Sequence, residues 1–99
     1  MPTEDISSNG AYDYLLDLLL ETNDKEQLSE ILEALLTDKE QQELVNRLKI
    51  FALLHQGVTQ REISARLGVG IATVSRGAKV FQQHQINELL PNISDKLKV

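Results

Sequence analysis

The side chains best suited to chemistry in this chain are hydrogen-bond donors that lie close together between residues 60 and 76. Gln60, Arg61, Thr73 and Ser75 carry amide, guanidinium and hydroxyl groups, which are the groups that bind the phosphates and base edges of duplex DNA. Arg61 has the forked geometry that suits guanine O6 and N7, so we expect it to read a base directly. Ile71 and Ala72 are expected to lie against the bases, near thymine methyl groups, and Gly70 to make a phosphate or water-mediated contact.

The residues that could perform catalysis do not form a recognisable constellation, and we therefore expect no enzyme. The chain has no cysteine, which excludes a thiolate metal site and a cysteine nucleophile. His55 and His84 are far apart and belong to no metal-ligand motif. Asp38, Glu40 and Glu43 lie near one another, but a helix cap and a solvated helix face explain them. We expect no metal and no prosthetic group.

A helix-turn-helix is predicted at residues 58–83. Thr59 and Glu62 form a T-x-x-E capping box at the start of its first helix. Val58 and Ile63 have the spacing of the hydrophobic staple that accompanies such a cap. The second helix opens with small residues, so little would hold its backbone away from the base edges in a major groove. The alternative is an ordinary pair of antiparallel helices in a bundle.

The rest of the chain is also expected to be helical, which predicts an all-α fold of about six helices. Apolar spacing places the further helices at about 9–21, 24–36, 37–56 and 85–90. No stretch has the alternating pattern of a strand, and no repeat or linker is evident.

Charge is distributed unevenly along the chain. Residues 1–46 hold twelve acidic residues and two lysines, a net charge of −10. Residues 47–84 hold six basic residues and one glutamate, a net charge of +5, and residues 85–99 are neutral overall. Phosphate binding requires positive charge at the contact surface, whatever the net charge of the whole chain. The alternative is that these charges only keep surface helices solvated.

No apolar run approaches the length of about twenty residues that spans a bilayer. The first ten residues are acidic rather than basic, unlike a targeting segment. We therefore expect a cytoplasmic protein with no membrane partner.

The helices before the helix-turn-helix are apolar on more than one face, and such helices must be buried nearly all round. A chain of 99 residues cannot cover that much surface, so we expect a second copy in an intertwined homodimer. The chain is then a single domain, 1–99, with a disordered 1–8, a dimerisation core at 9–56 and the helix-turn-helix at 58–83. The two copies would present their reading helices about 34–36 Å apart, in successive major grooves.

Several short motifs occur together between residues 35 and 81. They are LLT at 35–37, Arg47 and Lys49, QRE at 60–62, LGVGIAT at 67–73 and, most specifically, SRG at 75–77. With these motifs the segment resembles the bacterial tryptophan repressor family. The resemblance implies a repressor that binds a double-stranded DNA operator, requires L-tryptophan as corepressor and controls tryptophan biosynthesis operons.

The resemblance also implies where L-tryptophan binds, between the core and the helix-turn-helix of each half. Arg47 and Arg76 would hold the indole between their guanidinium planes, and Arg76 would attract the carboxylate. Backbone groups near Thr37 would take the ammonium. Gly77 would allow the close approach of the ligand, and tight helix packing is the alternative explanation for this glycine.

Two residues of the implied ligand site depart from the family pattern. Phe51 stands where a smaller aliphatic residue is usual, and Val80 replaces a small polar residue near the polar end of the ligand. Two alternatives to the tryptophan-dependent repressor therefore remain open. One is a relative that needs no ligand or answers another small molecule, with Phe51 as an internal plug. The other is a protein-interaction module that uses the same fold without DNA.

Overall fold

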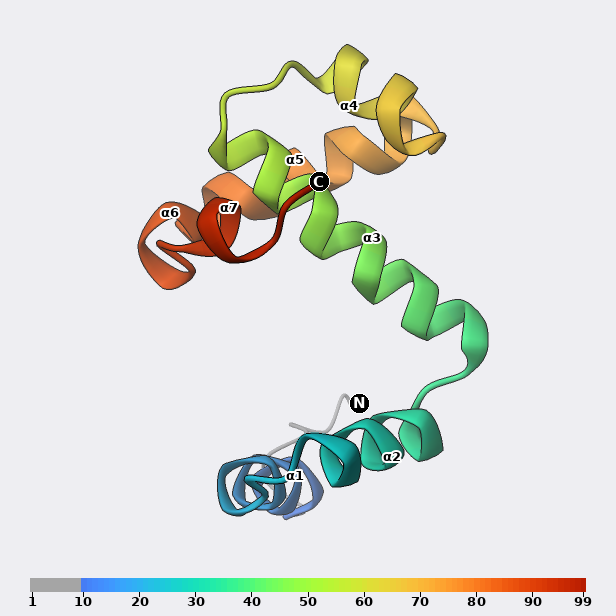
Figure 1. Ribbon diagram of the computed structural model, residues 1–99, viewed down its shortest axis with the longest axis vertical. Helices are drawn as coiled ribbons and strands as arrows, with labels where there is room; N and C mark the ends of the chain where they lie inside the picture. Colours follow the sequence, from blue (N-terminus) through green and yellow to red (C-terminus); the bar gives the residue numbers. More distant parts are fainter. Residues whose placement is uncertain (1–9) are drawn as a thin grey trace. The chain divides into compact units, whose positions relative to one another are not determined.

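The computed structural model describes residues 10–99, and the expected disorder of residues 1–8 lies outside them. The described chain is all-helical, as the sequence predicts, and contains seven helices (Figure 1). Their bounds are Ala11–Glu21 (α1), Lys25–Leu35 (α2), Asp38–His55 (α3), Gln60–Leu67 (α4), Ile71–Gln83 (α5), Ile86–Leu89 (α6) and Ile93–Lys96 (α7). The single helix expected near 85–90 is followed by a second one. Leu90 leaves the helical region, with φ −127° and ψ 65°, because the residue before Pro91 is disfavoured in the α conformation.

The chain forms two compact units, Met1–Asp38 and Lys39–Val99. The first unit contains α1 and α2. The Asp24 side chain caps α2 by accepting a hydrogen bond from the Glu26 N–H at 3.1 Å. Neither helix has a buried residue, and Leu20 and Leu35 are 83% and 57% exposed. The apolar faces of this unit therefore remain uncovered in the isolated chain.

The second unit joins α3 to the helix-turn-helix through one apolar cluster. Ile50 and Leu53 of α3 pack with Ile63 of α4 and Val74 of α5, and all four are at most 1% exposed. Val58, with the other partly buried neighbours, packs against this cluster, as the staple at the start of α4 predicts. The boundary between the compact units thus lies at Asp38, and α3 belongs with the helix-turn-helix rather than with α1 and α2.

A second cluster covers the opposite part of the α3 circumference. Phe51 and Ala52 pack with Ile86 of α6 and Ile93 of α7. The Phe51 ring lies 6.0 Å from the Phe81 ring of α5, at an interplanar angle of 57°, which is a favourable tilted arrangement. In Figure 1, α6 and α7 lie beside the carboxyl-terminal part of α3.

The two halves of α3 differ in how well the chain covers them. Residues 50–53 are all buried, although they are apolar on every side. In the amino-terminal half, Leu44, Val45 and Leu48 are 46%, 42% and 36% exposed. A helix that is apolar on every side is expected to be buried on every side. Within one chain, α3 meets this expectation only in its carboxyl-terminal half.

Candidate nucleic-acid interface

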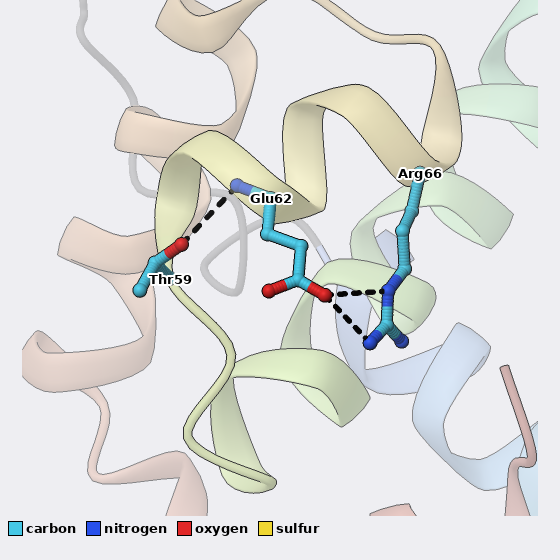
Figure 2. A network of polar contacts seen from close by, with 3 residues as sticks. All are labelled: Thr59, Glu62 and Arg66. Atoms are coloured by element: carbon cyan, nitrogen blue, oxygen red, sulfur yellow. Dashed lines mark hydrogen bonds and ion pairs between the residues drawn. The ribbon is translucent and has the colours of Figure 1, made fainter.

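The first helix of the helix-turn-helix begins at the predicted cap. Thr59 is extended, with φ −69° and ψ 155°, and its Oγ1 accepts a hydrogen bond from the Glu62 N–H at 3.2 Å. The Glu62 carboxylate accepts hydrogen bonds from Nε and Nη2 of Arg66 at 3.2 and 2.8 Å (Figure 2). The half of the capping box in which the Thr59 side chain accepts from the Glu62 N–H is thus confirmed. The Glu62 carboxylate pairs with Arg66. Both side chains of this pair are about half exposed, so the pair contributes little to stability.

The turn between the two helices is fixed by two local features. Gly68 ends α4 in the left-handed conformation, with φ 68°, and its N–H donates to the Ser64 carbonyl at 3.0 Å. This is the helix ending that glycine favours. The Ser64 hydroxyl also donates to the Val69 carbonyl at 2.6 Å, across the turn. As a result, Gly70 becomes the N-cap residue of α5, which starts at Ile71.

The residues predicted to contact DNA fall largely on the exposed face of α4 and α5. Arg61, Ala72 and Ser75 are exposed, Ile71 is 51% exposed, and a Cβ added at Gly70 would meet no atom within 4 Å. The backbone at the start of α5 is therefore open to a large partner. Val74 is fully buried in the first apolar cluster and so holds this face outward.

Two of the predicted contact residues, one from each helix, are joined by a hydrogen bond. The Ser75 hydroxyl donates to Gln60 Oε1 at 2.8 Å. Both residues are exposed. With its oxygen engaged, the Gln60 amide keeps both Nε2–H donors for an acceptor such as a phosphate oxygen.

The helix-turn-helix carries four basic side chains, Arg61, Arg66, Arg76 and Lys79. Arg66 is paired with Glu62, whereas Arg61, Arg76 and Lys79 have no ion pair among the described residues. All three are exposed. Unpaired guanidinium and ammonium groups are available for phosphate contact.

A cavity of about 330 Å³ lies between α3 and the helix-turn-helix. Arg47 of α3 and Arg76 of α5 both line it, as does Thr73. The Arg76 guanidinium also donates from Nη2 to Thr73 Oγ1 at 3.3 Å. Thr73, which is also predicted to contact DNA, is half-buried and belongs to this lining.

The structure does not gather all of the predicted ligand residues around this cavity. Gly77 is buried, and a Cβ there would lie 3.0 Å from Cγ2 of Ile50. Phe51 and Val80 pack in the second apolar cluster, with the α6 and α7 residues, and are not among the cavity-lining residues. Thr37 belongs to the other compact unit, so its role stays a prediction.

Four of the lining residues were not predicted as site residues: Glu43, Asn46, Ile50 and Val69. The first three share one face of α3 with Arg47, because residues at spacings of three, four and seven lie above one another on a helix. Helical spacing from Arg47 would therefore have found Glu43 and Ile50, and spacing from Glu43 would have found Asn46.

Two further features of the described residues are relevant to function. Within residues 10–99, no three side chains of the metal-binding types are grouped closely enough to hold a metal ion. None of the helices formed by these residues is long and apolar enough to cross a membrane.

Comparison with known proteins gives consistent matches over most of the chain. The family model described as Trp repressor protein matches residues 11–92. A Trp operon repressor homolog of Xylella fastidiosa (strain M23) is 34% identical over 86 residues, which cover 86% of this chain and 94% of the relative. A protein of the same name from Vibrio cholerae serotype O1 is 40% identical over 75 residues, or 75% of this chain and 73% of the relative. No solved structure gives a significant match.

Proposed function

The chain belongs to the Trp repressor family, and on that premise we propose that it is a homodimeric, sequence-specific DNA-binding repressor that requires bound L-tryptophan. Its target would be a double-stranded operator of tryptophan biosynthesis genes. A tryptophan-repressor-like regulator is what the family establishes. The dependence on ligand, the contact with DNA and the dimer are the parts of the proposal that need tests.

The observation that carries the proposal is the shared cavity of Arg47 and Arg76. These two guanidinium groups come from different helices and line one space of about 330 Å³, which lies in the size range of small-molecule sites. A guanidinium plane stacks on an aromatic ring and also pairs with a carboxylate. L-tryptophan carries an aromatic ring and a carboxylate, so its indole and its carboxylate each have a suitable partner here.

The position of the cavity gives a physical route from ligand to DNA. Thr73 and Arg76 belong to α5, the helix whose amino-terminal end is open for a major groove. A ligand carboxylate would compete with Thr73 for the Arg76 guanidinium. Binding would therefore favour one position of α5 relative to α3, and a ligand that favours one arrangement shifts the population toward it.

The dimer is supported by apolar surface that one chain leaves uncovered. α1 and α2 have no buried residue, and Leu44, Val45 and Leu48 of α3 are more than a third exposed. Exposed apolar surface of this extent marks an interface. A second copy is the economical partner, because it also supplies the second reading helix for a two-fold symmetric operator.

The decisive experiment measures operator binding with and without L-tryptophan. A duplex is first selected from a random library with the protein at saturating L-tryptophan, and its affinity is then measured by fluorescence anisotropy in both conditions. We expect L-tryptophan to tighten binding by about 5–150-fold, the usual range of effector coupling. L-alanine, which has no indole, serves as the ligand control and should have no effect.

A matched pair of variants locates the effect. Arg47→Ala should abolish the response to L-tryptophan, whereas Lys49→Ala removes a neighbouring positive charge that does not line the cavity and should preserve it. Equal operator affinity with and without L-tryptophan would instead favour a regulator that needs no ligand. Duplex binding without a steep dependence on salt would indicate a protein-interaction module.

A further inference from the structure

We propose that a second cavity of this chain binds an uncharged nucleobase, either free or as its nucleoside. The cavity has a volume of about 490 Å³ and is lined by residues of α3, α4, α5 and α6, all within the compact unit Lys39–Val99. This volume lies in the range of small-molecule sites. Most of its polar lining residues carry a side-chain amide, and we name it the amide cavity for them: Gln60, Gln82, Gln85 and Asn87.

The amide cavity is separate from the cavity that Arg47 and Arg76 line. The two share no lining residue. They also lie on different sides of α5, because Thr73 lines the arginine cavity and Gln82 the amide cavity, and nine residues make two and a half turns of a helix. A ligand of the amide cavity therefore does not occupy the place proposed for L-tryptophan.

The apolar part of the lining offers a surface for a flat ring. Leu54, Ala78 and Phe81 line the cavity and are half-buried, whereas its polar lining residues are exposed. The apolar side chains thus form the inner wall, and the polar side chains form the mouth. The centroid of the Phe81 ring lies 6.0 Å from that of Phe51, so this packing holds the ring in place. A planar aromatic ligand can pack against such a ring.

The amides at the mouth can form hydrogen bonds with the edge of the flat ring. The side chains of Gln82, Gln85 and Asn87 have no hydrogen-bond partner within residues 10–99. Each primary amide presents one acceptor and two donors. For this reason glutamine and asparagine pair with both N6 and N7 of adenine. Gln85 has φ 50° and ψ 57°, and the chain turns at this residue from α5 into α6, which carries Asn87.

The charge of the lining disfavours anionic ligands. Among the described residues, Glu88 is the one charged residue that lines the amide cavity, and no lysine, arginine or histidine does. A phosphate or carboxylate would find no positive partner there and would be repelled by Glu88. An uncharged base avoids this repulsion, and its exocyclic N–H group can donate to the Glu88 carboxylate. The lining therefore favours a nucleoside over a nucleotide.

Occupancy of the amide cavity would oppose DNA binding, a consequence that rests on the proposed function. Gln60 lines the cavity and is also one of the residues expected at the DNA. The Ser75 hydroxyl already donates to Gln60 Oε1, so Gln60 offers its Nε2 donors. A base that accepts from Nε2 takes the donors that a phosphate oxygen would use. Nucleoside and operator should therefore weaken each other's binding by the same factor.

The binding test is an NMR titration of the full chain with adenosine, in which the side-chain amide signals are followed. We expect the signals of Gln82, Gln85 and Asn87 to shift. Gln82→Ala should weaken adenosine binding by about tenfold. Gln83→Ala removes the neighbouring glutamine, which is exposed and does not line the cavity, and should leave the affinity unchanged. Adenosine 5′-monophosphate should bind more weakly than adenosine, and Glu88→Gln should reduce that difference.

Three results of this titration would overturn the proposal. The first is that millimolar adenosine shifts none of these amide signals. The second is that Gln82→Ala and Gln83→Ala bind adenosine equally well, which would place the ligand elsewhere. The third is that the monophosphate binds more tightly than adenosine, which would contradict the preference for an uncharged ligand.

The link to DNA is measured separately, as operator affinity by fluorescence anisotropy at saturating L-tryptophan, with and without adenosine. Adenosine should weaken operator binding of the wild type by about fivefold or more, and the same concentration should have a smaller effect on Gln82→Ala. An unchanged operator affinity at saturating adenosine would refute the competition through Gln60. A chain that binds adenosine at the amide cavity but binds no duplex would contradict the proposed function and support this site.

Discussion

At Gly77, α5 packs closely against Ile50 of α3, so the addition of one methyl group there tests how the reading helix is held. A Cβ at this position would lie 3.0 Å from Cγ2, 3.7 Å from Cδ1 and 3.8 Å from Cβ of Ile50. Carbon atoms normally rest about 3.5–4.0 Å apart. Gly77→Ala therefore requires the two helices to separate by several tenths of an ångström, or Ile50 to move.

Ile50 has little freedom to move, and this sets the expected magnitude. It is 1% exposed, and a β-branched side chain in a helix is held almost entirely in one χ1 rotamer. Overpacking of this kind costs about 1–3 kcal/mol, and the stiff neighbour places the cost in the upper half of that range. Alanine gains about 1 kcal/mol over glycine in a helix interior. The expected net change is a loss of about 1–2 kcal/mol in the free energy of unfolding.

A double-mutant cycle with Ile50→Leu isolates the contact. Leucine has no branch at Cβ, so the atom that the added methyl group would meet at 3.0 Å is removed, while this near-isosteric change alone should cost less than about 1.5 kcal/mol. In the Ile50→Leu background, Gly77→Ala should be neutral or stabilising by up to about 1 kcal/mol. The coupling energy between the two sites is then about 2 kcal/mol, within the range for residues in contact.

The assay is urea unfolding of the four proteins at one fixed protein concentration, since the stability of a dimer depends on it. Ala78→Gly, at the next position of the same helix, measures the difference in helix propensity between alanine and glycine. It should lower the free energy of unfolding by about 1 kcal/mol. The reasoning is refuted if Gly77→Ala stabilises the wild-type background by that amount, because α5 would then have room at this position. Gly77 would in that case be explained by the ligand rather than by helix packing.

Three further changes test other parts of the structure. Thr59→Ala removes the acceptor of the Glu62 N–H and should cost about 1 kcal/mol, or about 4–8 °C in Tm by calorimetry, whereas Thr59→Ser should preserve both. Arg61→Ala should weaken operator binding by about 1–3 kcal/mol and relax the sequence preference at one position of each half-site; an unchanged preference in library selection would leave Arg61 only a phosphate contact. Leu48→Glu, at a position 36% exposed in the isolated chain, should shift sedimentation from dimer to monomer or unfold the chain, and a wild type that stays a folded monomer would contradict the dimer.

The sequence predicts the local structure well because the signals that determine it are themselves local. The cap at Thr59 depends on a donor three residues away, and the end of α4 depends on the left-handed freedom of Gly68. The break before α7 was less clear, since α6 and α7 span only four residues each. Helices this short are stabilised by the residues that pack on them, here Phe51 and Ala52, and not by their own propensity.

The site is harder to predict than the fold because α3 is apolar on every side over residues 50–53. Hydrophobic periodicity identifies a buried face only when the other faces are polar. It therefore did not indicate that Ile50 faces the cavity and α5, while Phe51 faces α6 and α7. Gly77 poses the same problem, because a close ligand and a close helix both call for glycine in the sequence. Only the tertiary contact with Ile50 distinguishes them.

The arrangement of these residues suggests why ligand and DNA would be coupled through α5. At Gly77 and Val74 the helix packs against Ile50 and the first apolar cluster, while at Thr73 and Arg76 it borders a cavity of about 330 Å³. A helix that is packed on one side and borders an open space on another can change its tilt when that space is filled. The end that tilts is the end with Gly70 and the exposed residues expected at the DNA. A ligand in this cavity would then change the presentation of the reading helix without touching a base. Gly77→Ala, by moving α5 away from Ile50, should alter operator affinity even when L-tryptophan still binds.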